Sequence, residues 1–218
     1  MRRPKDIVKS VVKSLIPHRM ISQKLNAKGK GAILLTFDDG PDPDITPHLL
    51  NLLREYDARA MFFVPGSRIE RAPALLKEIL KQGHVLGNHT DSHGDVAGLS
   101  FQQYRDEILK CQKKIFAITG ESPRYFRPPE GIITLPMIYA ARSSQLRIVR
   151  WSVETGEYSY MTESEPDALA SNLMQSIESR SIVLSHDDNK KIPLLYEIVL
   201  PKLKEMGFNL HKGLDYLD

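Results

Sequence analysis

The stretch TFDDGPD, residues 36–42, follows an apolar run that begins at Ala32, and the prediction of the fold starts from it. Side chains of neighbouring strand residues point to opposite faces of a sheet, so Asp38 and Asp39 can serve one site only where the strand ends and turns. The Gly-Pro pair that follows them supplies such a turn. The stretch therefore predicts a strand end with two carboxylates, one able to bind a metal and one able to accept a proton. A solvated turn is the alternative.

Short apolar runs alternate with helical patterns from residue 31 onward, which indicates an α/β fold. The predicted strands are 32–37, 60–64, 84–86, 125–126, 147–151, 181–184 and 208–210. The predicted helices are 46–56, 72–82, 101–119, 134–144, 165–179 and 193–206. Strands of the first half are apolar on both faces, as in a parallel sheet covered by helices. The alternation suits a compact β/α barrel or a doubly wound sheet, in which functional residues gather after the carboxyl ends of strands.

Composition and charge divide the chain of 218 residues into two parts. Residues 1–30 carry nine Lys or Arg against one acid, a net charge of +8, which leaves 31–218 at −5 and the whole chain at +3. The positive charge thus belongs to a basic arm and gives no support to a nucleic-acid partner. Charged residues make up 26% of the chain, as in ordinary globular domains, and the single cysteine, Cys111, excludes an internal disulfide.

The basic arm has apolar residues at helical spacing between Ile7 and Ile16, with lysines beside them. These lysines interrupt the apolar run that a signal peptide requires, so a cytoplasmic location is expected. One interpretation is an amphipathic helix that lies on an anionic membrane surface, which would make the protein membrane-peripheral. The other is a terminal helix docked on the main domain, and the lack of Trp or Phe in the arm favours it.

Two histidines, His89 and His93, follow the predicted strand 84–86. Their spacing places both imidazoles on one side of a helical turn, where they can bind one cation. Together with an aspartate of the upstream stretch 36–42 they form the ligand pattern of a catalytic divalent site with open positions. Surface or core histidines are the alternative. His84 is interpreted as structural, and no role is assigned to His18, His48 and His211.

Polar groups also follow three later strands. Arg127 cannot lose its proton, so it suits holding a carboxylate in one orientation, and the backbone N–H of Glu130 could face a developing oxyanion. His186 is a natural general acid, and Glu157 is the carboxylate expected to fix its tautomer and raise its pKa. Each group alone could be an ordinary loop residue, but their common position after strand ends favours one site.

Taken together, these segments resemble the polysaccharide deacetylases of carbohydrate esterase family 4, the NodB-homology domain. The segments Thr36–Asp42, His89–His93 and Leu184–His186 match the family pattern fully, the resemblance spans residues 31 to about 210, and residues 31–218 are predicted to be the catalytic domain. It implies a distorted, TIM-like (β/α) barrel of about seven strands, preceded by the basic arm 1–30. It also implies a divalent metal, most often zinc in this family, bound by Asp39, His89 and His93.

The resemblance also implies a role for each remaining site residue. Asp38 would be the general base, oriented by Arg127, and His186 the general acid, tuned by Glu157. The metal would polarise an acyl carbonyl and lower the pKa of a water that attacks it, after which His186 protonates the leaving amine. Leu184 would line the pocket for the acyl methyl group. The residues expected to contact the substrate are Pro129, Glu130, Trp151, Tyr158 and Leu184.

Two departures from the family pattern qualify these expectations. Glu130 stands where the family has an aromatic residue, and Glu157-Tyr158 replaces an Asp-Trp pair. The leading hypothesis is a cytoplasmic metal-dependent hydrolase that removes an N-acetyl group from an amino sugar or a nucleotide- or lipid-linked glycan precursor. One alternative is an esterase or amidohydrolase that acts on O-acetyl or non-sugar amide substrates. The other is a catalytically weakened, carbohydrate-binding member of the family.

Overall fold

The computed structural model describes residues 20–158 and 165–217, which form an eight-stranded parallel sheet of order β1-β6-β5-β4-β3-β2-β8-β7. The strands are β1 (Ile21–Ser22), β2 (Leu34–Asp38), β3 (Ala60–Val64), β4 (Val85–Asn88), β5 (Tyr125–Phe126), β6 (Arg147–Val149), β7 (Val153–Glu154) and β8 (Ile182–His186). All neighbouring strands of this sheet pair in parallel, so their carboxyl ends meet at one edge.

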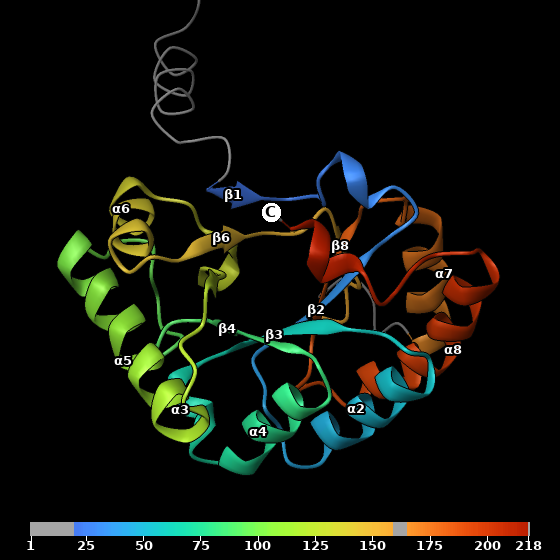
Figure 1. Ribbon diagram of the computed structural model, residues 1–218, viewed down its shortest axis with the longest axis horizontal. Coiled ribbons are helices and arrows are strands. Elements are labelled where there is room, and N and C mark those ends of the chain that lie inside the picture. The colour runs from blue at the N-terminus through green and yellow to red at the C-terminus, as the bar shows by residue number, and fades with distance from the viewer. Residues whose placement is uncertain (1–19, 159–164, 218) are drawn as a thin grey trace, which may run out of the picture.

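Helices cover the outer side of the curled sheet (Figure 1). The α-helices are α2 (Ile45–Glu55), α3 (Gly66–Ile69), α4 (Pro73–Lys81), α5 (Phe101–Thr119), α6 (Leu135–Ser143), α7 (Pro166–Ser176) and α8 (Lys191–Glu205). Short 3-10 helices are η1 (Ala27–Gly29), η2 (Pro129–Gly131) and η3 (Gly213–Tyr216). Among the described helices, none has the length and apolar character needed to cross a bilayer.

The two ends of the sheet are joined by one continuous segment. β6 pairs with β5 and β1 at one end and β7 pairs with β8 at the other, yet only residues 150–152 separate them in the chain. The N–H of Arg150 donates to Ser22 O at 2.8 Å, and the N–H of Ser152 donates to Ile182 O at 3.0 Å. This segment therefore brings the sheet round into a distorted barrel, and the predicted α/β fold class is confirmed.

Alternation along β2 separates an outer core from an inner one. Leu35 and Phe37 pack in the core under the helices, whereas Leu34 packs with Met61 and Phe63 inside the curl of the sheet. All five residues of β2 are buried, as the apolar pattern predicted. Because side chains alternate with a period of two, Asp38 shares the inner face with Leu34.

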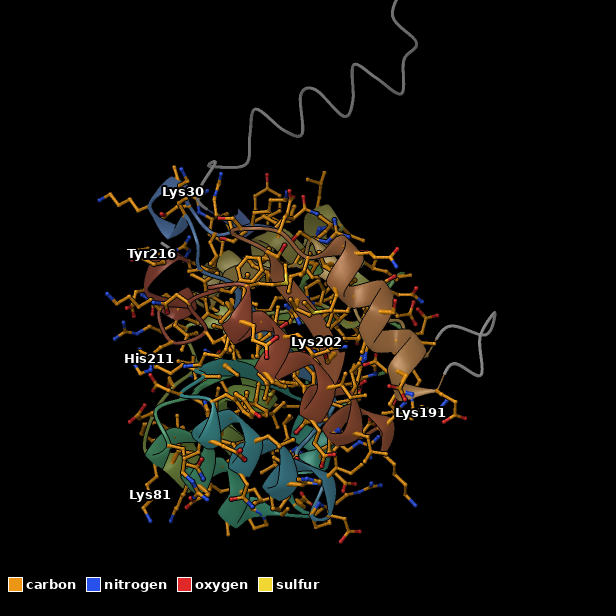
Figure 2. All side chains as sticks on the ribbon, turned by 90° about the vertical axis from the view of Figure 1, so that its right-hand side faces the viewer. Lys30, Lys81, Lys191, Lys202, His211 and Tyr216 are labelled. Carbon is orange, nitrogen blue, oxygen red and sulfur yellow. The ribbon has the colours of Figure 1, made fainter. Side chains whose placement is uncertain are left out.

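The two ends of the barrel are distinct. Lys30 precedes β2 and Lys81 precedes β4, whereas Lys191 follows β8. Figure 2 shows Lys30 and Lys81 on one side of the molecule and Lys191 on the other. Polar residues that follow the strands therefore gather at the Lys191 side.

The structure differs from the expected elements at the shortest strands. The sheet has eight strands rather than about seven, because the two-residue strands β1 and β7 carry no usable periodic pattern. The predicted strand 208–210 is wrong, since only an isolated bridge between Asn209 and Ala32 forms there. The other predicted helices and strands are present with shifted ends. The sheet curls into a distorted barrel, so of the two predicted architectures the barrel is the one observed.

The predicted arm, residues 1–30, falls partly outside the described residues. The predicted helix and the lysines that one interpretation places on a membrane precede residue 20, so both lie outside the described residues. Residues 20–30, in contrast, pack onto the domain: Ile21 pairs with Ile148 in the sheet, and Leu25 is fully buried in the inner core. The boundary predicted at residue 30 thus lies inside the folded domain.

Candidate active site

The site begins where β2 ends. Asp38 is buried on the inner face and stands opposite His186 in the pairing of β2 with β8. Asp39 adopts the left-handed backbone conformation, with φ of 71°, so the chain turns there and its carboxylate leaves the strand direction. Two adjacent carboxylates reach one site through this turn, as the sequence predicted.

Asp39, His89 and His93 form the one group of described residues arranged to hold a metal ion. Their ligand atoms lie within 4.8 Å of one another. Asp39 Oδ1 is 3.1 Å from His93 Nε2 and 3.6 Å from His89 Nε2, and it is buried without a hydrogen-bond donor among the described residues. Two imidazole nitrogens and a carboxylate oxygen that converge in this way fit a divalent cation with open positions.

The environment of His89 prepares it to act as a ligand. Its Nδ1 lies 2.7 Å from the backbone oxygen of Arg127, which requires the proton on Nδ1 and leaves the lone pair of Nε2 toward Asp39. Burial lowers the pKa of His89 to about 3, with the nearby Asp39 opposing it. A neutral imidazole in a fixed tautomer is the form that binds a metal.

The loop that carries the two histidines is not the helical turn predicted from their spacing. Residues 89–93 are irregular, and Thr90 and His93 have φ of 65° and 52°. The side chains still converge, with ring centroids 4.8 Å apart. The predicted convergence of the two side chains is therefore present and the predicted helical turn is wrong, because a helical i, i+4 spacing is only one way to bring two side chains together.

Arg127 fixes Asp38 from inside the barrel. Its Nη1 donates to Asp38 Oδ1 at 2.7 Å and lies 2.8 Å from the hydroxyl oxygen of Thr36. Its other donors reach the backbone oxygens of Val149 and Arg150, at 3.0 and 3.2 Å. Burial raises the pKa of Asp38 above its ordinary value, although Arg127 opposes this. A carboxylate whose pKa is raised in this way is a better proton acceptor near neutral pH.

Glu157 and His186 form a second pair at the end of β8. Glu157 Oε1 lies 2.9 Å from His186 Nδ1 and accepts the backbone N–H of His186 at 2.8 Å, while Thr155 donates its hydroxyl to the other oxygen. Burial alone would lower the pKa of His186, but Glu157 and the charge of Asp38 outweigh it and raise that pKa to about 9. The predicted contact is present, and the longer glutamate reaches it directly.

The residues predicted to contact a substrate lie in three places. Leu184 is buried, and it pairs with Thr36 two residues before the pair formed by Asp38 and His186. Tyr158 is half exposed and packs its ring edge-on against His186, with centroids 4.8 Å apart. A further group lies in the segments after β5 and β6: Pro129 is buried, Glu130 is exposed at φ of 56°, and Trp151 packs against Gly131.

Sequence reasoning missed several residues around the site. Asp187 is buried, accepts the hydroxyl of Thr46 at 2.6 Å and donates its own N–H to Asp38 O at 3.1 Å. Asp188 accepts the Tyr158 hydroxyl at 2.5 Å and pairs with Arg68 at 3.2 Å. Their position directly after His186 at a strand end was a usable signal.

Comparisons of the sequence with protein families and with curated relatives both find deacetylases that act on polysaccharides or peptidoglycan. The sequence profile described as polysaccharide deacetylase matches residues 26–149. Over 183 residues the chain is 34% identical to a peptidoglycan-N-acetylglucosamine deacetylase of Bacillus cereus, which covers 82% of this chain and 65% of that relative. The chain spans less than two thirds of the length of the first curated relatives that it matches.

Two crystal structures extend the comparison to the fold. The Bc1960 peptidoglycan N-acetylglucosamine deacetylase is 29% identical, with a TM-score of 0.82 and 92% of each chain covered. A Bacillus anthracis protein described as a pseudoenzyme of carbohydrate esterase family 4 is 26% identical, with a TM-score of 0.81 and 95% of this chain and 71% of that one covered. Since the same fold occurs with and without activity, function has to be argued from the site residues.

Proposed function

The chain belongs to the polysaccharide deacetylase family, and from this premise we propose that it hydrolyses the N-acetyl group of an amino-sugar unit, most simply N-acetylglucosamine in a glycan. One observation carries the proposal. Asp38 and His186 stand opposite each other on adjacent strands, and the cluster of Asp39, His89 and His93 begins at the next residue. A proton acceptor, a proton donor and a cation site thus meet at one edge of the sheet.

The divalent metal of this proposal would be held by Asp39, His89 and His93, with zinc as the first choice for an N2O ligand set. When bound, such an ion supplies Lewis acidity toward the acyl carbonyl and toward water. The chain's own contribution is to keep His89 neutral and aligned through Arg127 O, and to direct the buried oxygen of Asp39 at the two imidazoles.

Proton transfer would be divided between the two strands. Asp38, held by Arg127, accepts a proton from the attacking water, and its raised pKa suits that task. His186 is kept protonated by Glu157 and donates to the leaving nitrogen. An amide needs this donation because an amine is a poor leaving group until protonated, whereas an ester needs it far less. A strongly supported acid therefore favours N-acetyl over O-acetyl substrates.

The two departures from the family pattern, Glu130 and Glu157-Tyr158, do not break the contacts among the residues proposed for proton transfer. Glu157 reaches both the ring and the backbone of His186, so the change from aspartate does not separate the pair. The Glu130 side chain is exposed, and the proposed use of its N–H for an oxyanion stays a prediction. Every residue proposed for metal binding and proton transfer is present, which supports an active enzyme over a silent carbohydrate-binding member.

Acetate release tests the proposal. The metal-loaded chain is assayed on peptidoglycan, N-acetylglucosamine oligomers, nucleotide-linked N-acetylglucosamine and acetylated xylan, with a chelated sample as control. We expect release from the N-acetyl substrates, loss on chelation and recovery with a divalent metal. Faster release from acetylated xylan would favour the esterase alternative, and no release from any substrate with zinc bound would overturn the proposal.

The location of the protein in the cell would decide which N-acetylated glycan it meets. A cytoplasmic location would favour nucleotide- or lipid-linked precursors, whereas the names of the relatives favour peptidoglycan. The proposed membrane contact would involve residues 1–19, which carry six Lys or Arg and one Asp. The described chain begins just before β1, whose amino end lies at the end of the barrel opposite the site, because β1 runs parallel to the other strands.

Sedimentation with anionic vesicles tests the membrane proposal. The full chain is compared with a variant that lacks residues 1–19 but keeps β1 and Leu25, which belong to the fold. We expect the full chain to sediment with the vesicles at low salt and the variant to remain in solution. Equal sedimentation of both would overturn it.

A further inference from the structure

One face of α5 lies against the loop that carries the histidine ligands. Glu107 on this face accepts three hydrogen bonds through a single oxygen, Oε2. The donors are the N–H of Asp91 at 3.1 Å, the N–H of Ser92 at 2.8 Å and the hydroxyl of Ser92 at 2.9 Å. All three belong to the segment between His89 and His93, so one carboxylate holds the backbone of that segment.

Lys114, two turns further along α5, contacts the same segment through Asp91. Its Nζ lies 2.8 Å from Asp91 Oδ1 and 3.4 Å from Gly66 O at the start of α3. Asp91 O in turn accepts the N–H of Ser67 at 2.7 Å. The hydrogen bond with Asp91 raises the pKa of Lys114, which keeps it charged. The loop between the ligands is thus fixed to both α5 and α3.

The two histidines differ in how much they need this support. His89 is buried, and its ring is fixed by the hydrogen bond to Arg127 O. His93 is one-third exposed, and its backbone N–H lies 3.3 Å from the Thr90 hydroxyl. Thr90 and His93 also have positive φ, a conformation that costs energy for residues other than glycine and persists only where the surroundings enforce it. The position of His93 therefore depends on the backbone of the loop.

We propose that Glu107 is a positioning residue of the metal site, which acts by fixing residues 91–92 so that His93 Nε2 stays within reach of Asp39. The inference rests on the proposed function, because it assumes that Asp39, His89 and His93 bind a metal. Loss of a group that orients a ligand commonly weakens metal binding 10–100-fold. Since Glu107 acts through the backbone of one ligand, we expect the lower end, about tenfold.

The test measures zinc affinity, by competition with a chromophoric chelator, for the full chain and for the variants Glu107→Ala, Glu107→Gln and Lys110→Ala. Alanine removes all three hydrogen bonds, so its Kd should rise about tenfold. Glutamine keeps an oxygen that can accept the same donors, so its Kd should stay within about threefold of the parent value. Lys110 is exposed on the same helix and serves as the matched control, with an unchanged Kd.

Melting temperatures of the metal-free and zinc-loaded forms separate positioning from general stabilisation, because a ligand stabilises according to its affinity. A lower Tm of metal-free Glu107→Ala with an unchanged Kd would show that Glu107 only stabilises the fold, which overturns the inference. If Glu107→Ala does not fold, Ser92→Ala replaces it: loss of one of the three donors should raise Kd about two- to threefold, and an unchanged Kd overturns the inference. Failure of the unaltered chain to bind any divalent metal would overturn the proposed metal site itself.

Discussion

At the end of β2, Asp39 presents a buried oxygen that accepts no hydrogen bond from the described residues, whereas at the end of the neighbouring β8 both oxygens of Glu157 are engaged. The first region gathers two imidazoles and a carboxylate around a common point. The second pairs one carboxylate with one histidine through the ring and the backbone. Under the proposed function a cation would complete the metal half of the site, whereas the acid half has its partners within the chain.

This difference means that the two halves should respond separately to change. Removal of metal should alter the surroundings of Asp39 and leave the contact between Glu157 and His186 in place. Asp38 and Arg127 connect the halves, since Asp38 lies beside Asp39 in the chain and opposite His186 in the sheet. Variants at the connection should have the largest effects on catalysis, and variants within the acid half smaller ones.

The largest effect is expected for Asp38→Asn. Asparagine keeps an oxygen that can accept from Arg127 Nη1, but it cannot take a proton from water, so kcat should fall about 10³-fold. The zinc Kd should stay within about threefold of the parent value, since Asp39 and not Asp38 is assigned as the ligand. Steady-state acetate release and chelator competition measure the two quantities. Loss of zinc binding together with activity would mean that the two aspartates have been assigned to the wrong roles.

Arg127→Lys should have the next largest effect. A lysine cannot reproduce the donors that Arg127 directs at Asp38 and at the backbone oxygens of Val149 and Arg150, so buried acceptors lose their partners. We expect a loss of about 3 kcal/mol in the free energy of unfolding, measured in urea. The kcat should fall about 10²-fold as Asp38 loses its fixed orientation. An unchanged stability would show that Arg127 does not connect the two halves.

Much of this site could be predicted from sequence because its residues follow strand ends in short motifs. Asp38, Asp39 and the two histidines stand in stretches whose residue types have few other uses together. Glu157 and His186 are far apart in the chain, and their contact follows from the pairing of β7 with β8 at one sheet edge. A parallel sheet brings such strand ends together wherever they lie in the sequence.

The sequence did not predict the path of the histidine loop, the contacts of Glu107 or the two-residue strands β1 and β7, because none of these leaves a periodic pattern or a motif. The histidine loop is irregular, although its spacing favoured a helical turn, and the side chains that contact it, Glu107 and Lys114, lie well after it in the sequence. Glu107 lies in the middle of a polar helical pattern and looks like an ordinary surface acid. The two-residue strands β1 and β7 are too short to show a period, and β1 lies in a segment whose basic charge suggested a separate arm.

Glu157→Gln tests whether the acid half depends on its carboxylate. His186 must be protonated to act, and Glu157 contributes to a pKa of about 9. Without the charge that pKa falls, so the limb on which kcat declines at high pH should move to lower pH, with kcat down about tenfold at pH 8. Glu154→Gln, the same change at an exposed position on β7, is the control and should leave the profile in place.

The same variant has a consequence for stability against pH. The folded pKa of His186 lies above the unfolded value of 6.5, so its stabilising contribution is fully present below about pH 6.5 and is lost as pH rises toward 9. The metal-free parent should therefore lose more stability than Glu157→Gln between these pH values. Equal slopes, measured by urea unfolding, would contradict a charged pair in the folded state.

The smallest effect is expected for Glu157→Asp, which restores the shorter acid of the family pattern. In this chain Glu157 already reaches the ring nitrogen and the backbone N–H of His186 as well as the Thr155 hydroxyl, so a shorter side chain must give up or lengthen at least one of these bonds. We expect kcat to fall about two- to fivefold, which is about 0.4–1 kcal/mol in the barrier, and the high-pH limb to move by less than in Glu157→Gln. Acetate release between pH 6 and 10, compared with both glutamine variants, measures this. A variant faster than the parent would mean that the glutamate holds His186 poorly, and the acid half would then be no more complete than the metal half.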